Sequence, residues 1–215
     1  MKPKIINVAK KYLGCTSGDK KQKKLVNIFN SVKPNGYTAK VSDPWCAIAV
    51  TAWAIEAYGK EKAKKYFPLS ASVPDMLRKA AKMKIWIESD RIKPKSGDLV
   101  LYDWDDTGIG DNRNSPDHVG LVTNVGLTVF TVIEGNKGKK HVCAYRWLDI
   151  DGRYIRGFIR PDYDDLEHRK TDADRINKLA DDVIAGKYGN GSERKKKLGK
   201  DYEAVQAEVN RRLQK

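Results

Sequence analysis

Cys46 is the residue of this 215-residue chain with the clearest setting for nucleophilic chemistry. The stretch Asp43-Pro44-Trp45-Cys46 predicts the start of a helix, with Asp43 as the N-cap and Pro44 at the first helical position. Cys46 would then lie at the third helical position, inside the first turn. Because the free N–H groups and the macrodipole of a helix N-terminus favour an anion, this position favours the thiolate form of a cysteine. The pattern indicates a reactive thiol, with an inert buried cysteine as the alternative.

A nucleophilic cysteine needs a base, and the chain has three histidines. His141 lies in a lysine-rich turn and His168 in a polar stretch, where solvated side chains are expected. His118 instead begins an apolar run that is followed by a short turn centred on Gly126 and a second apolar run. If the two runs pair as an antiparallel hairpin around Gly126, His118 lies directly opposite Glu134. Directly opposite Cβ atoms are about 4.5 to 5.5 Å apart, so Glu134 would orient the imidazole.

Asn136 follows Glu134 by two residues and is expected on the same face of the strand. Together, Cys46, His118, Glu134 and Asn136 have the composition of a thiol hydrolase site. They would supply the nucleophile, the base, an orienting carboxylate and an amide that fixes the ring or the oxyanion. The alternative for His118 and Glu134 is a structural cross-strand pair, and a one-residue slip in register would place the two on opposite faces.

The elements that must position these residues follow an order of helices first and strands second. Helices are predicted around residues 5–13 and 21–30, and a longer apolar one begins near Pro44. Short β-rich runs broken by Gly, Asn and Asp follow at residues 99–102, 119–125 and 128–133. This order favours an α+β fold.

The C-terminal part of the chain has a different pattern. The polar stretch 162–171 predicts a linker between a first domain, residues 1–161, and a helical tail, residues 172–215. In the tail, Gly186 and the stretch 189–191 end one helical stripe before another begins near Tyr202. A small bundle of short helices is therefore expected after the linker.

The composition narrows the class of protein and its partners. The chain is 40% hydrophobic and 33% charged, with a net charge of +14, so it has a core and a strongly basic surface. No stretch approaches the roughly 18 apolar residues that span a bilayer, and no signal-peptide pattern follows the N-terminus, so we expect a chain made in the cytoplasm without membrane insertion. The basic run 194–197 is expected to be a solvated helix face, since no nucleic-acid recognition motif accompanies it. We therefore expect no nucleic-acid partner.

Four segments, taken in order, resemble the CHAP family, the cysteine, histidine-dependent amidohydrolases/peptidases of bacterial wall lysis. These are residues 44–47 with Trp53 further along the helix, residues 94–100, residues 117–122 and residues 131–136. The resemblance covers about residues 5–160 and implies a papain-like fold, with N-terminal helices packed on an antiparallel sheet. It also implies that Cys46 is the nucleophile, His118 the base, and Glu134 and Asn136 the orienting residues. Trp45 and Asp117, which precede Cys46 and His118, are the expected substrate contacts.

The family resemblance implies a phage or prophage endolysin that hydrolyses amide bonds of a Gram-positive peptidoglycan. The expected activity is that of an N-acetylmuramoyl-L-alanine amidase. An endopeptidase of the stem or cross-bridge with the same site, and a non-catalytic wall-binding protein, are the alternatives. Such an enzyme would reach the wall from the host cytoplasm through a phage-made pore. No cofactor or metal is expected, because the acidic stretch 103–117 lacks EF-hand spacing and predicts a solvated loop or a substrate rim, with a calcium site as the alternative.

The tail resembles one copy of the muropeptide-binding wall repeat found at the end of certain phage lysozymes, which is a three-helix bundle. Asp182, Arg194 and Gln206 are the expected contacts to sugar and peptide, with a purely structural role in the bundle as the alternative. A single copy provides no avidity unless the chain oligomerises, and the oligomeric state is left open. The two remaining cysteines, Cys15 and Cys143, are expected to be small buried residues without an assigned partner.

Overall fold

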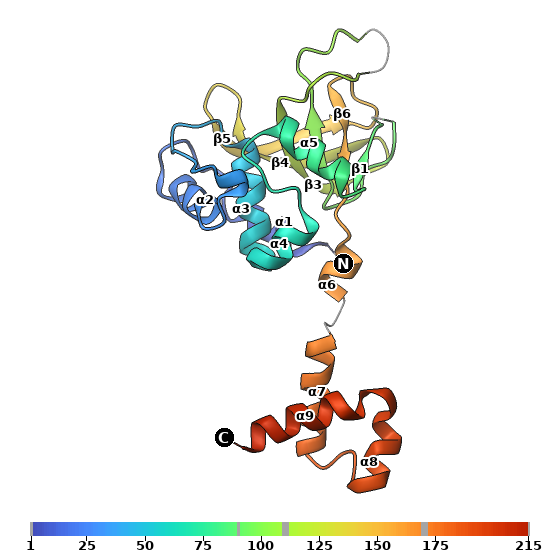
Figure 1. Cartoon of the computed structure of the whole chain (residues 1–215). Helices are drawn as coiled ribbons and strands as arrows, with labels where there is room; N and C mark the ends of the chain where they lie inside the picture. Colours follow the sequence, from blue (N-terminus) through green and yellow to red (C-terminus); the bar gives the residue numbers. More distant parts are fainter. Residues whose placement is uncertain (1, 90, 109–111, 169–171, 215) are drawn as a thin grey trace. The chain divides into compact units, whose positions relative to one another are not determined.

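The computed structural model describes residues 2–89, 91–108, 112–168 and 172–214 of the chain. It divides into two compact units, Met1–Leu166 and Glu167–Lys215 (Figure 1). Within the described residues, no helix combines the length and the apolar character that crossing a bilayer requires.

The segment predicted to be a linker, residues 162–171, contains a helix, α6 (Tyr163–His168). The first unit therefore extends beyond the predicted boundary at residue 161, as far as Leu166. This segment belongs to the first unit because Leu166 is buried in its core and because the Tyr163 hydroxyl donates a hydrogen bond to the Gly97 carbonyl at 2.8 Å. Residues 169–171 of the predicted linker lie outside the described residues.

The first unit has an α+β fold, as the order of helices and strands predicted. Within the described residues, its sheet has six strands in the spatial order β1-β6-β2-β3-β4-β5, and every neighbouring pair is antiparallel. The strands are β1 (Trp86–Ile87), β2 (Leu99–Tyr102), β3 (His118–Val125), β4 (Val129–Lys137), β5 (Val142–Asp149) and β6 (Ile155–Ile159). The three predicted β-rich runs correspond to β2, β3 and β4, and the other three strands were not predicted.

Both faces of the sheet carry apolar side chains, and they alternate along each strand as the pleat requires. On β2, Leu99 and Leu101 join the core that the helices cover, whereas Val100 and Tyr102 belong to a second cluster on the opposite face. A strand that is buried on both faces has no hydrophobic/polar alternation, which is why β2 appears in the sequence as a continuous apolar run.

Helices of the first unit pack against one side of this sheet (Figure 1). They are α1 (Lys4–Lys10), α2 (Lys20–Asn30), α3 (Cys46–Tyr58), α4 (Lys60–Tyr66) and α5 (Val73–Lys82), with a 3-10 turn, η1 (Pro34–Gly36), between α2 and α3. The central helix is α3, which contacts α1, α2, α4, β3 and β4. All of its residues from Cys46 to Ile55 are buried, because a helix that is apolar on every side needs neighbours all round.

The second unit has its own small core. In the described part of this unit, the core is formed by the helices α7 (Asp172–Ile184), α8 (Gly191–Leu198) and α9 (Tyr202–Leu213), with a 3-10 turn, η2 (Gly199–Asp201), before α9. Side chains from all three helices meet in one cluster, made up of Ala180, Val183, Leu198, Val205 and Val209. The helical bundle predicted from the spacing of these residues is therefore present.

Candidate active site

Cys46 lies at the first position of α3, two positions closer to the helix end than the sequence predicted. The helix begins at Cys46, and Trp45 is its N-cap. Asp43 does not cap α3, because its carboxylate accepts hydrogen bonds from the Lys40 backbone N–H and the Tyr37 hydroxyl, each at 2.7 Å, and closes the preceding turn. The thiol is 5% exposed and remains within the first turn, where the free N–H groups of the helix converge.

His118 is the first residue of β3, and its side chain reaches the buried carboxylate of Glu134 on β4. The distance from His118 Nε2 to Glu134 Oε2 is 3.4 Å. His118 is 8% exposed and Glu134 is fully buried. The predicted contact between these two side chains is therefore present.

The strand register that places them together differs from the predicted one. Leu121 pairs with Ile133 and Val122 with Val132, so the register continues to Gly120, not His118, opposite Glu134. A bulge between Val122 and Asn124 shifts the pairing nearer the turn. His118 therefore meets Glu134 as a diagonal neighbour on the same face, a separation that long side chains can bridge.

Gly120 makes the diagonal contact possible because it has no side chain. A Cβ atom placed there would lie 2.9 Å from Glu134 Cγ and 2.3 Å from Val132 Cγ1. The space that a side chain would fill is used by the Glu134 side chain on its way to His118.

Arg146, on β5, is a residue of this site that the sequence did not reveal. Its Nε donates a hydrogen bond of 2.6 Å to Glu134 Oε1, the carboxylate oxygen that does not face His118. Its register partner is Val132, two residues before Glu134, so Arg146 lies on the same face of the sheet. The alternation of side chains along β5 would have placed Arg146 on the face of Glu134, but β5 itself was not predicted.

The charges of this group reinforce one another. Burial raises the pKa of Glu134, but the hydrogen bonds and charges of His118 and Arg146 have the larger, opposite effect and lower this pKa to about 2. Burial lowers the pKa of His118, but the hydrogen bond and charge of Cys46, and then those of Glu134, raise it to about 9. The imidazole therefore interacts with both the Cys46 thiol and an ionised carboxylate.

Asn136 lies near this group but is hydrogen-bonded elsewhere. Its Oδ1 is 2.8 Å from Nδ1 of His141, the histidine that was expected to be solvated. Asn136 adopts a left-handed backbone with φ of 57°, next to an irregularity in the β4–β5 pairing after Glu134. The simple strand alternation that was to place Asn136 beside Glu134 therefore fails at this point.

Two aromatic rings, those of Tyr102 and Trp104, lie beside the histidine, with ring centroids 5.6 Å and 6.1 Å from its own. Tyr102, the register partner of His118, is fully buried, and burial followed by the charge of Glu134 raises its pKa well above the ordinary value. Trp104 stacks on Tyr102 with ring centroids 4.8 Å apart and is 37% exposed, and Arg146 lies over its ring at 4.9 Å. Trp45, an expected substrate contact, is instead fully buried, with its indole N–H donating to Ser17 Oγ at 2.9 Å.

One hollow is lined by His118, and another is lined by residues that flank Cys46 in the sequence. One, of about 300 Å³, opens beside the histidine and is lined by Trp104, His118, Asn136, Gly138 and Arg146. The other, of about 510 Å³, adjoins the start of α3, where Pro44 and Ile48 are among its lining residues together with Tyr37 and Ser72. Asp117, the second expected substrate contact in this unit, is exposed, and its carboxylate accepts a hydrogen bond of 3.0 Å from the Trp104 backbone N–H.

The expected wall contacts of the second unit are largely engaged within it. Arg194 donates to the Gly189 carbonyl at 2.9 Å and to Gln206 Oε1 at 3.0 Å, and Gln206 in turn donates to Asn210. Asp182 forms an ion pair with Lys187 at 2.6 Å. Arg194 and Gln206 therefore join α8 to α9, which is the structural role left open as the alternative.

Cys15 and Cys143, for which no partner was assigned, lie next to each other. The Cys143 backbone N–H donates to the Cys15 carbonyl, and the Gly14 N–H donates to the Cys143 carbonyl, both at 2.8 Å. A hydrogen bond from the Cys143 thiol lowers the pKa of the Cys15 thiol. Both cysteines are free and buried, as expected of residues outside the site.

Comparisons with known proteins identify the tail. Residues 177–213 match the CW_7 repeat, a cell-wall repeat, which is consistent with the predicted wall repeat and supports an association of the chain with cell-wall material. No curated protein matches the chain. Among solved structures, the crystal structure of Ly7917 is similar with a TM-score of 0.37 and 13% identity, over 65% of this chain and 62% of that one. The chain thus spans about three fifths of the length of Ly7917.

Proposed function

We propose that the first unit is a cysteine-dependent hydrolase of peptidoglycan amide bonds and that the CW_7 repeat keeps it on the cell wall. The observation that carries this proposal is the connected set Cys46, His118, Glu134 and Arg146. A nucleophile, a base and an orienting carboxylate in contact are what covalent hydrolysis of an amide requires. The resemblance to the CHAP family, argued from the sequence, supports the same assignment.

In the first step, the Cys46 thiol gives its proton to His118, its sulfur attacks the carbonyl carbon of the scissile amide, and the carbonyl oxygen becomes an oxyanion. The N–H groups at the start of α3 are free of helical partners and provide donors for that charge. Because His118 Nε2 faces Glu134, the other ring nitrogen, Nδ1, is the one available to Cys46.

In the second step, His118 gives a proton to the amine that leaves, and a thioester with Cys46 remains. Water then attacks the thioester and gives a proton to His118, the carboxylic acid is released, and His118 returns the proton to the Cys46 sulfur to restore the free thiol. Throughout, Glu134 holds the imidazole ring, and Arg146 holds Glu134. Arg146 is thus a positioning residue and not a catalytic one.

The two hollows indicate where an extended substrate would lie. One adjoins the start of the Cys46 helix and the other adjoins His118, so each is next to one member of the reactive pair. Within the hollow beside His118, the exposed face of Trp104 offers a surface for the apolar face of a sugar or a peptide side chain. The preferred bond is the amide between muramic acid and L-alanine, and cleavage within the stem or cross-bridge peptide uses the same residues.

The experiment is the clearing of purified Gram-positive cell walls, followed as a loss of turbidity, with mass spectrometry of the released fragments. Wild-type protein is compared with Cys46→Ala and with Cys143→Ala, a matched control that removes a buried thiol outside the site. We expect clearing by the wild type and by Cys143→Ala, and none by Cys46→Ala. Free stem peptides would identify an amidase, and cut peptides still attached to sugar would identify an endopeptidase.

Two results would contradict the proposal. Equal clearing by Cys46→Ala would exclude the thiol mechanism. Wild-type protein that sediments with the walls without clearing them would leave a wall-binding protein, which is the function that the CW_7 repeat supports by itself.

A further inference from the structure

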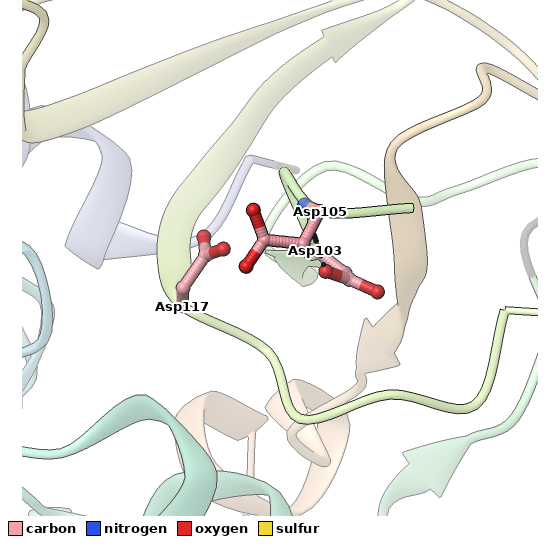
Figure 2. A group of neighbouring side chains, drawn as sticks. All are labelled: Asp103, Asp105 and Asp117. Carbon is pink, nitrogen blue, oxygen red and sulfur yellow. Dashed lines mark hydrogen bonds between the residues drawn. The ribbon is translucent and has the colours of Figure 1, made fainter. Parts of the chain in front are cut away.

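Three aspartates come together where β2 ends and β3 begins, next to the proposed active site. Asp103 follows Tyr102, the last residue of β2, Asp105 lies two residues further on, and Asp117 directly precedes His118. Because Tyr102 pairs with His118, the two strands bring Asp103 and Asp117 to the same end of the sheet. One carboxylate oxygen from each aspartate lies within 4.8 Å of the other two (Figure 2).

Among the described residues, this cluster has no lysine or arginine ion-pair partner, although the chain has a net charge of +14. Neighbouring carboxylates do have one: Asp106 lies near Arg153, and Asp98 accepts from Arg160. Within the part of the chain that the structure describes, no lysine or arginine forms an ion pair with Asp103, Asp105 or Asp117. The repulsion among the three carboxylates is therefore not offset by an ion pair with a lysine or an arginine.

Asp103 supplies the second, separate indication of a ligand. Its side chain is 1% exposed, and its Oδ2 is buried without a hydrogen-bond partner among the described residues. Its other oxygen accepts a hydrogen bond from the Asp105 backbone N–H at 3.0 Å. A buried carboxylate oxygen that accepts nothing is unfavourable unless a cation or a proton meets it.

We infer that Asp103, Asp105 and Asp117 bind one divalent cation of the Ca²⁺ class. The donor set consists of carboxylate oxygens, which hard cations prefer. Two oxygens that are each about 2.4 Å from a common Ca²⁺ ion are at most about 4.8 Å apart, the span within which these three atoms lie. Asp105 and Asp117 are exposed, which leaves room for the waters that complete a coordination shell of about six to eight oxygens.

The cation would also order the segment that carries Trp104. The Trp104 backbone lies between two of the ligands and donates to the third, and its ring is 6.1 Å from that of His118. The cation site does not depend on the proposed hydrolase activity, but if that activity is present, the ion fixes one wall of its cleft.

The test is binding of Ca²⁺ and Tb³⁺ to the whole chain. Tb³⁺ luminescence excited through tryptophan reports the site, because Trp104 is adjacent in sequence to both Asp103 and Asp105. We expect a saturable Tb³⁺ signal that CaCl₂ displaces, a calorimetric signal with CaCl₂, and a rise in Tm in CaCl₂. Trp104→Leu should lose most of the luminescence but keep the calorimetric signal.

Asp105→Asn is the main variant, since Asp105 is exposed and its replacement leaves the core intact. It should weaken Ca²⁺ binding at least tenfold, whereas Asp149→Asn, an exposed aspartate at the end of β5, should bind as the wild type does. The weakest extracellular calcium modules have a Kd of about 1 mM, so binding is followed up to about 10 mM CaCl₂. An absence of saturable binding over that range would overturn the inference. Equal binding of Ca²⁺ by wild type and Asp105→Asn would also overturn it. If no binding is found and Asp117→Asn is more stable than wild type, the result would indicate a proton shared by Asp103 and Asp117 in place of a cation.

Discussion

Glu134 is a fully buried carboxylate whose two oxygens have different partners. Oε1 accepts from Arg146 and Oε2 faces His118. A buried charge is tolerated only when it is paired on all sides, and removing one partner leaves the other with a desolvated charge. The proposed base is therefore held in place through Glu134 by a guanidinium that does not itself meet the substrate in the mechanism.

Replacing Arg146 by methionine should destabilise the first unit by about 2 kcal/mol, because it removes a hydrogen bond to a charged, buried acceptor. The measurement is urea unfolding of wild type, Arg146→Met, Glu134→Gln and the double variant. We expect a coupling free energy of about 1 kcal/mol or more between the two residues. A double variant whose loss equals the sum of the single losses would show that the contact adds no stability.

Replacing Gly120 by alanine should remove most of the wall-clearing activity, at least tenfold, with a moderate loss of stability. The new Cβ would lie 2.3 Å from Val132 Cγ1 and 2.9 Å from Glu134 Cγ, so both side chains must shift, and we expect this to disturb the contact of Glu134 with His118. Overpacking of this kind destabilises by about 1 to 3 kcal/mol. Rates are to be compared at a temperature where unfolding curves show both proteins to be folded. A folded Gly120→Ala variant with full activity would contradict the role assigned to the Glu134–His118 contact.

At the scale of the elements, the N-terminus of α5 shows how one side chain joins separate segments. Asp75 lies in the first turn of α5 and accepts from Asn35 Nδ2 at 2.8 Å and from Lys79 Nζ at 3.1 Å. Burial raises the pKa of Asp75, but hydrogen bonds from Ser70, Asn35 and Lys79 and the charge of Lys79 lower it to about 2, against an ordinary value of 3.8.

This lowered pKa predicts a pH dependence of stability with a definite sign. The contribution of Asp75 is fully present above its unfolded-state pKa of 3.8 and is lost as the pH falls toward 2. Asp75→Asn should therefore lower the free energy of unfolding by about 1 kcal/mol at pH 7 and make little difference near pH 2. Urea unfolding at pH 7, 4 and 2 measures this. A difference that stayed constant with pH would show that the effect does not come from the charge.

Helices and strands were predicted best where the spacing of apolar residues on one face, or a local rule such as a glycine at a helix end, determines them. The order of helices and strands and the helical bundle of the tail followed from apolar spacing and from glycines at helix ends. The contact of His118 with Glu134 was predicted, but its register was not, because the bulge between Val122 and Asn124 depends on packing that hairpin rules do not include. Arg146 was missed because strand pairing brings β5 to the site from a separate segment. For the acidic stretch 103–117 a calcium site was only the alternative, because a loop and not a sequence motif brings Asp103, Asp105 and Asp117 together.

At the scale of the whole molecule, the chain combines a unit that carries the candidate site with a unit that matches a cell-wall repeat. Each has its own buried core. The net charge of +14 adds a separate, unspecific attraction to anionic wall polymers. This attraction acts over about 10 Å at 0.1 M salt and is strongly screened in concentrated salt, so salt separates it from recognition by the repeat.

A single substitution in the core of the repeat should separate wall binding from hydrolysis. Val205 is fully buried in the cluster shared by α7, α8 and α9, so Val205→Asp places an unpaired carboxylate there. That burial costs several kcal/mol, which is comparable to the whole stability of a unit of this size. Ala207→Asp adds the same charge on an exposed position of α9 and is the matched control.

We expect wild type and Ala207→Asp to sediment with purified walls in both 0.05 M and 0.5 M NaCl, and Val205→Asp to do so only at the lower concentration, through net charge. Hydrolysis of soluble muropeptides should be the same within about twofold for all three proteins, because Cys46, His118 and Glu134 belong to the other unit. Sedimentation of Val205→Asp in 0.5 M NaCl would show that the first unit binds the wall by itself. A parallel loss of muropeptide hydrolysis would show that the two units depend on each other for folding.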